Sequence, residues 1–313
     1  MLFLLLGLAG IAGLVLGIAA VLGATILSPE TAAQRYLDAL AAGRLDEAAQ
    51  LAPTGAEGED AALLGGPVLA DPAARIAEVA VGAATREGGV ATVPVAYTLA
   101  GEREQAQLTL VRGVSFLDLA GDWRVAAPLA GTLELPATPT DRVSVNGVDV
   151  TTGPQGSAHP VYPGVYTITP ARGDDLFALD TPQEVTVAAG ATVEAGLPFT
   201  ATPALTAAVQ DAVDAAVAAC ATSTDRNPVG CPFGIEIFDE YQNLAWSIAQ
   251  TPAVAVDAAA GTFASDGAGR ATASYEVQTY DGRGWEPASQ GTAFAVQGTF
   301  TVVSGEVSVA LTG

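Results

Sequence analysis

The two cysteines of the chain, Cys220 and Cys231, are the first residues whose spacing suggests chemistry. Ten residues separate them in the 313-residue sequence. This is not the C-x-x-C spacing of redox motifs, and two thiols without a nearby histidine cannot complete a zinc site. In an exported domain, such a pair is typical of a structural disulfide. We therefore expect Cys220 to be linked to Cys231.

The only histidine, His159, stands between Ala158 and Pro160 in a polar segment. A catalytic histidine needs a partner nucleophile and an orienting acid, and nothing in the sequence assigns these partners. We therefore expect His159 to lie in an exposed loop.

Acidic side chains gather in three places, which are Glu57–Asp60, Asp174–Asp175 and Asp239–Glu240. Paired acids can hydrolyse glycosides or bind calcium. None of the three has the spaced D-x-D-x-D-G pattern of a calcium loop. In a chain this acidic, we expect all three to be solvated surface.

Other catalytic motifs are missing from the sequence. The chain has no lysine, which excludes a P-loop, and it has neither G-x-S-x-G nor S-x-x-K. The three tryptophans, Trp123, Trp246 and Trp285, fall in or beside predicted strands. We therefore expect them to be anchors of the core and not platforms that bind a ligand. We predict no catalytic, cofactor-binding or metal site, and that the protein is not an enzyme.

The charge of the chain restricts its partners. Its 34 acidic and 12 basic residues give a formal net charge of −22, and all of them follow Leu27. A phosphate backbone would be repelled, so nucleic acid is excluded as a partner. The exclusive use of arginine as the basic residue suggests a high-GC, actinobacterial genome, with a salt-adapted organism as the alternative.

Residues 1–27 carry no charge and no proline. A helix of this length would run about 40 Å, enough to cross a hydrocarbon core of about 30 Å. A signal peptide cleaved after Ala24 is the alternative, but the apolar run is long for one and lacks a basic start. We predict a single-pass membrane anchor, with the rest of the chain outside the cytoplasm.

Two cap-and-proline pairs, Ser28-Pro29 and Thr202-Pro203, are typical helix starts. The first predicts a helix that stops near Gly43, followed by a short helix from Leu45 to Leu51. The second predicts a helix to Cys220, whose apolar stripe is Leu205, Val209, Ala212, Val213, Ala216, Val217 and Cys220.

Segments with period-two alternation predict strands. They are 75–85, 90–100, 104–112, 122–127, 253–265, 270–280, 290–302 and 306–312. Asn146-Gly147 between two valines predicts a tight type I′ hairpin.

These elements predict an α+β protein. We expect a transmembrane helix at 1–27, a helix-plus-antiparallel-meander unit at 28–130, a small all-β sandwich at 131–202 and a second, disulfide-containing helix-plus-meander unit at 203–313. The last unit repeats the helix-then-meander order of the first unit, as a diverged copy of it would.

Two segments resemble known families. The run PETAAQRYLDALAAGRLDEAAQLAP, closed by GDWRVAAPL, resembles the nuclear transport factor 2-like cone that follows the membrane helix of many actinobacterial envelope proteins. The segments RVSVNGVDV and YPGVYTI resemble the PEGA-like small β-sandwich of surface proteins, although the connection between them is longer than in that family. The cone fold hosts enzymes, binding modules and spacers, so it transfers no function.

The sequence favours a membrane-anchored, extracytoplasmic envelope protein that acts as a non-catalytic binding or spacer module. Its partner would be an unknown envelope protein or ligand. A sensory or regulatory ectodomain is the second hypothesis, and a hydrolase that uses one cone-shaped pocket is the third.

Overall fold

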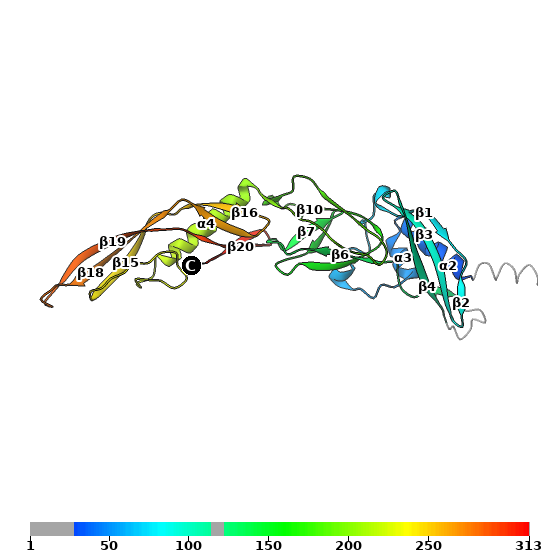
Figure 1. Ribbon diagram of the computed structural model, residues 1–313, viewed down its shortest axis with the longest axis horizontal. Coiled ribbons are helices and arrows are strands. Elements are labelled where there is room, and N and C mark those ends of the chain that lie inside the picture. The colour runs from blue at the N-terminus through cyan, green and yellow to red at the C-terminus, as the bar shows by residue number, and fades with distance from the viewer. Residues whose placement is uncertain (1–27, 114–121, 313) are drawn as a thin grey trace, which may run out of the picture.

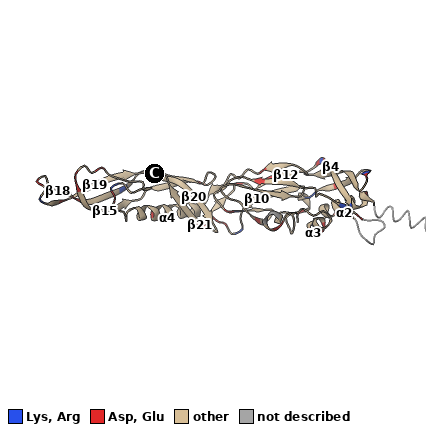
Figure 2. Cartoon of the chain, turned by 90° about the horizontal axis from the view of Figure 1, so that it is seen from below, with Lys and Arg blue, Asp and Glu red and all other residues tan. Residues whose placement is uncertain are grey.

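The computed structural model describes residues 28–113 and 122–312, which form an elongated molecule (Figure 1). Helix α2 (Pro29–Ala41) and strand β2 (Thr85–Glu87) lie near one end. Strands β15 (Tyr241–Gln250), β18 (Gly269–Gln278) and β19 (Trp285–Phe294) reach the other end. A view turned by 90° gives the same order (Figure 2).

The fold is mostly β, so the predicted α+β class is wrong. Strands hold about 45% of the described residues and helices 16%. The described ranges contain three α-helices, with 13, 7 and 18 residues, and many more strands. The two modules predicted to hold a helix, 28–130 and 203–313, do contain one, but the helix covers only part of a much larger set of strands.

The membrane helix predicted at 1–27 lies outside the described residues. In the ranges that the structure describes, no helix is long and apolar enough to cross a membrane.

The first group of elements places two helices against one antiparallel sheet. Ser28 caps α2 as predicted, because its Oγ accepts a hydrogen bond from the Thr31 N–H at 3.2 Å. The sheet has the order β1-β3-β4-β5, with β2 also paired to β3. The other elements are α3 (Leu45–Leu51), the 3₁₀ turns η1 (Gly58–Ala61) and η2 (Pro72–Ala74), β1 (Ala77–Val81), β3 (Val90–Leu99), β4 (Glu102–Arg112) and β5 (Trp123–Val125).

The middle of the molecule is built from strands alone. Asn146 and Gly147 have φ values of 47° and 78°, which confirms the predicted tight hairpin between β7 and β8. Its sheets have the orders β12-β10-β7-β8, β13-β6-β9 and β11-β14. The strands are β6 (Gly131–Leu135), β7 (Arg142–Val145), β8 (Val148–Thr151), β9 (Ser157–Val161), β10 (Gly164–Pro170), β11 (Phe177–Ala178), β12 (Gln183–Val187), β13 (Thr192–Glu194) and β14 (Thr200–Ala201).

The last group contains α4 (Pro203–Cys220) and strands that run through two sheets. The sheets have the orders β15-β18-β19 and β16-β17-β20-β21. Only two residues separate β17 from β18, and only two separate β19 from β20, so these strands continue from one sheet into the other. The elements not yet given are β16 (Ala253–Asp257), β17 (Thr262–Asp266), β20 (Gln297–Val303) and β21 (Glu306–Leu311).

The predicted apolar stripe of α4 is the part of the helix that packs. Leu205, Val209, Val213 and Val217 are fully buried, and α4 contacts β16 and β21. Thr202 caps the helix by accepting a hydrogen bond from the Leu205 N–H at 3.2 Å. The helix start and the buried face both agree with the sequence pattern.

The first and middle groups are joined by hydrogen bonds between side chains and the backbone. The Tyr36 hydroxyl on α2 accepts from the Leu129 N–H at 2.9 Å, and the Asn146 amide donates to the Val68 carbonyl at 2.8 Å. The Tyr97 hydroxyl accepts from the backbone N–H of Ala189 at 3.0 Å. These bonds fix the α2 end of the molecule to the middle strands.

The middle and last groups are joined by backbone bonds around one short bridge. Thr140 pairs with Val302 in parallel orientation. The Val302 N–H donates to the Pro139 carbonyl at 2.7 Å, and the Asp141 N–H donates to the Val302 carbonyl at 3.2 Å. These bonds attach strand β20 to the segment 139–141, which leads into β7.

Candidate functional site

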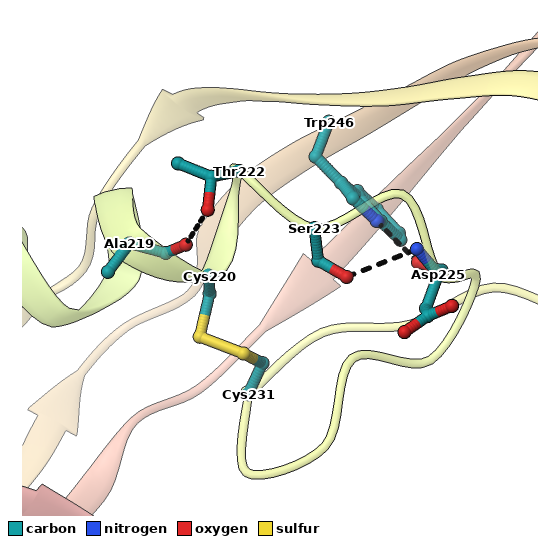
Figure 3. The surroundings of a disulfide bond; sticks show 7 residues. All are labelled: Ala219, Cys220, Thr222, Ser223, Asp225, Cys231 and Trp246. Carbon is teal, nitrogen blue, oxygen red and sulfur yellow. Dashed lines mark hydrogen bonds between the residues drawn. A yellow bond between two sulfur atoms is a disulfide. The ribbon is translucent and has the colours of Figure 1, made fainter.

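The disulfide predicted from the sequence is present and joins Cys220 to Cys231 (Figure 3). Cys220 is the last residue of α4, and Cys231 lies in the loop that leads to β15. The same loop is also held by Trp246, whose Nε1–H donates to the Asp225 carbonyl at 2.8 Å. The ring of Phe233, further along the loop, packs 4.7 Å from the ring of Trp246. This arrangement is structural, because it fastens the loop to the helix end and to the sheet.

His159 does not lie in an exposed loop, so that expectation is wrong. It sits in β9 with 5% of its surface exposed and is paired in register with Leu133. Its Nε2 lies 2.9 Å from Ser157 Oγ, and this hydroxyl donates to the Thr151 carbonyl at 3.0 Å. A hydroxyl has one proton, so in this geometry the imidazole donates to the serine and does not activate it. The pair connects β9 to the end of β8.

The acidic segments Asp174–Asp175 and Asp239–Glu240 lie in different groups of elements, before β11 and before β15, and Glu57 is exposed ahead of η1. Asp174 accepts a hydrogen bond from the Leu176 N–H at 2.9 Å, which is a local turn contact. Asp239 and Glu240 are exposed ahead of β15. Within residues 28–113 and 122–312, no group of three or more His, Cys, Asp or Glu side chains is arranged to hold a metal ion.

The space between α2 and its sheet is filled with side chains. Tyr36, Leu37, Tyr97, Leu108 and Leu110 are each at most 1% exposed. Beside α2 the surface carries two grooves of about 530 and 540 Å³, lined in part by Arg35. The interior of the unit is therefore packed at these side chains and forms no cone-shaped pocket there.

Three tyrosines occupy the junction between the first and middle groups. Burial, together with a smaller contribution from the nearby charge of Asp46, raises the pKa of Tyr162 to about 12. Burial also raises the pKa of Tyr36 and of Tyr166, with a smaller contribution from Tyr162. All three hydroxyls therefore stay protonated at neutral pH, and those of Tyr36 and Tyr166 form hydrogen bonds to the backbone.

The end of the molecule opposite α2 carries a group of exposed aromatic side chains. We call residues 238–241 and 275–286 the distal tip. Phe238 is 94% exposed, Tyr280 is 108% exposed and Trp285 is 40% exposed. The expectation that tryptophans mark the core is correct for Trp246, at 7% exposed, and wrong for Trp285.

Strand register places these three aromatic residues at the same end of the sheet. Tyr241, the first residue of β15, pairs with Val277, and Trp285, the first residue of β19, pairs with Gln278. The Gln278 N–H donates to the Glu240 carbonyl at 3.0 Å, which continues the pairing toward Phe238. Tyr280 lies in the turn between β18 and β19.

The turn that carries Tyr280 is ordered by its own hydrogen bonds. Thr279 Oγ1 donates to an Asp281 carboxylate oxygen at 2.8 Å and accepts from the Gly284 N–H at 2.9 Å. The same carboxylate oxygen accepts from the Arg283 N–H at 3.2 Å. The Thr279 bond, followed by the Arg283 bond, lowers the pKa of Asp281.

The distal tip was not predicted from the sequence, because β15 was not predicted. The signal was present, since Leu244, Trp246 and Ile248 alternate with smaller side chains. Asp281-Gly282 is likewise a turn signal between two strands. The meeting of residues from segments about 40 residues apart, however, depends on strand pairing that short-range patterns do not specify.

Comparisons with protein-family models, with curated proteins and with solved structures gave no match to this chain. The resemblances to the nuclear transport factor 2-like cone and to the PEGA-like sandwich therefore stay predictions from the sequence.

Proposed function

We propose that this chain is a membrane-anchored, extracytoplasmic envelope protein that acts as a non-catalytic spacer and binding module. The observation that carries the proposal is the position of the two ends. The charge-free residues 1–27 directly precede α2, at one end of the elongated molecule, and the distal tip lies at the other. A protein attached to a membrane at its first residues would hold the tip away from the lipid surface.

Two further features support an exported location. The Cys220–Cys231 disulfide is of the kind that persists in oxidising compartments. The net charge of −22, carried entirely after Leu27, disfavours contact between the body and an anionic lipid surface. Both features agree with a body that extends away from the membrane.

Fractionation of cells that produce the full chain tests this proposal. We expect the protein to stay in the membrane pellet after carbonate extraction, and protease added to intact spheroplasts to digest the body. As a control, a variant in which a cleavable signal peptide replaces residues 1–27 should be released. Release of a mature form that lacks residues 1–24 would contradict anchoring, and protection from protease would contradict the topology.

A further inference from the structure

The aromatic side chains at the distal tip differ from the other apolar side chains of the surface. The remaining large hydrophobic residues that are exposed in the described ranges are valines, namely Val90, Val111, Val229 and Val303. Phe238, Tyr280 and Trp285 are the exposed aromatic residues there, and they all gather at this one end. Exposed aromatic clusters are typical of protein interaction sites, where rings supply contact area at low entropic cost.

The distal tip is ordered by contacts among its own residues. The bonds of Thr279 to Asp281 and to Gly284 define the turn around Tyr280. The rings of Tyr241 and Tyr275 meet edge to face at 6.4 Å beside it. A surface that is already ordered loses less conformational entropy when it binds.

The negative charge of the distal tip favours a positively charged partner. Five carboxylates lie in or beside the aromatic group, from Asp239, Glu240, Glu276, Asp281 and Glu286, and Arg283 is the basic residue there. No ion pair forms among the described residues 203–312, so these carboxylates are not neutralised by salt bridges within this part of the chain. Such a surface attracts cations, and the faces of aromatic rings bind guanidinium and ammonium groups directly.

The edge of the distal sheet favours recognition by side chains. Strand β19 is an edge strand, because it pairs with β18 only. It carries Pro287 near the tip, and proline has no backbone N–H to offer to an added strand. A partner strand added beside β19 would therefore lack a backbone hydrogen bond at Pro287, close to Trp285.

We propose that the distal tip binds a protein partner through a surface of that partner rich in arginine and lysine. The guanidinium and ammonium groups stack on the rings of Phe238, Tyr280 and Trp285, and the surrounding carboxylates accept their hydrogen bonds. This inference rests on the proposed function, in which the tip projects away from the membrane toward other envelope proteins.

The test uses the full chain in nanodiscs of phosphatidylcholine, with a fluorescently labelled octa-arginine peptide as the probe. Binding is followed by fluorescence anisotropy at about 0.15 M salt, where the Debye length is about 8 Å and distant charges are screened. A hexamer of N-acetylglucosamine is the second probe, because aromatic rings beside carboxylates are also able to bind sugars.

The decisive variant removes the aromatic rings and keeps every charge: Phe238→Ser, Tyr280→Ser and Trp285→Ser together. We expect the dissociation constant for the peptide to rise about tenfold or more. The matched control is Val229→Ser with Val303→Ser, which removes exposed apolar side chains elsewhere in residues 203–312 and should leave binding unchanged. Circular dichroism and the absence of free thiols check that each variant is folded.

A second variant keeps the rings and removes charge, with Asp239→Asn, Glu240→Gln and Glu286→Gln. Asp281 is left in place because it orders the turn. We expect this variant to lose affinity for the peptide as well. Equal binding by the serine variant and the original chain would overturn the inference, because the general acidity of the protein would then explain the binding.

Two other results would also overturn the inference. They are binding of the sugar hexamer without binding of the peptide, and binding of neither probe. The proposed function is tested separately, by membrane fractionation and protease digestion of the same variants. If the protein is anchored and exported but the peptide does not bind, the inference fails and the proposed function stands.

Discussion

At the scale of single residues, two buried tyrosine hydroxyls allow a matched comparison. The Tyr36 hydroxyl accepts a hydrogen bond from the buried Leu129 N–H, whereas the Tyr162 hydroxyl has no hydrogen-bond partner among the described residues. Tyr36→Phe leaves the N–H without an acceptor, so we expect it to lower the free energy of unfolding by about 1–3 kcal/mol. Tyr162→Phe removes an unsatisfied polar group, so we expect an increase of about 1 kcal/mol.

Guanidinium unfolding of the full chain in detergent, followed by circular dichroism, measures both changes. The two substitutions delete the same atom type from neighbouring positions, so each is the control for the other. A loss of stability in Tyr162→Phe as large as that in Tyr36→Phe would contradict the assignment of hydrogen bonds at this junction.

The same tyrosines predict how stability depends on pH. Burial raises the pKa of Tyr162 to about 12, above the value of about 10 in an unfolded chain. Between these values the unfolded chain loses protons that the folded protein keeps, so the free energy of unfolding falls as pH rises. The loss is about 1.4 kcal/mol per pH unit for each such tyrosine, and it is absent below pH 10.

Unfolding curves recorded at pH 9 and pH 11 check this dependence. We expect a clearly lower midpoint at pH 11, and a smaller difference in the Tyr162→Phe variant. Midpoints that agree at the two pH values would contradict the burial of these hydroxyls.

At the scale of elements, the disulfide fastens a loop that has little regular structure. Replacing Cys220 and Cys231 together by serine frees the denatured chain from a short closed loop. We expect the free energy of unfolding to fall by about 2–3 kcal/mol. The fold should persist, because Trp246 still holds the loop through the Asp225 carbonyl and the Phe233 ring.

Reduction of the unaltered protein is the control, and it should lower the unfolding midpoint as far as the double substitution does. Thiol labelling of unreduced protein taken from the envelope should find no reactive cysteine. Quantitative labelling of both thiols would show that the disulfide does not form in the cell, and would remove one support for an exported body.

The elements that could be predicted from the sequence are those with local signals. Ser28-Pro29 and Thr202-Pro203 mark helix starts, and Asn146-Gly147 marks a hairpin, because a cap or a positive φ depends on neighbouring residues alone. The predicted strand 253–265 is in fact β16 and β17, since residues 258–261 turn the chain between them.

The features that could not be predicted depend on contacts that are distant in the sequence. His159 is buried where β9 pairs with β6, and Trp285 is 40% exposed at the start of β19, an edge strand at the end of its sheet. The α+β class was wrong for a related reason, since a few helices with strong local signals received more weight than many strands with weak ones.

At the scale of the whole molecule, length comes from strands that continue through two sheets. Strand β18 alone, with ten residues, spans about 33 Å. It follows β17 after two residues, so the two strands extend the body along its long axis (Figure 1). The central claim is that this length separates the distal tip from the membrane.

Energy transfer from labelled protein to acceptor lipids tests that claim most directly. A donor dye is attached to p-azidophenylalanine at position 87 or at position 281, with the full chain in vesicles that carry acceptor headgroups. Position 87 ends β2, which lies beside the first turn of α2, because Arg86 pairs with Glu30 at 3.1 Å. Position 281 lies in the turn of the distal tip.

We expect strong energy transfer from position 87 and little from position 281, because the body holds the tip away from the lipid. Comparable transfer from both positions would show that the molecule lies along the membrane, or is not anchored by its first residues. Either result would contradict the proposed spacer function.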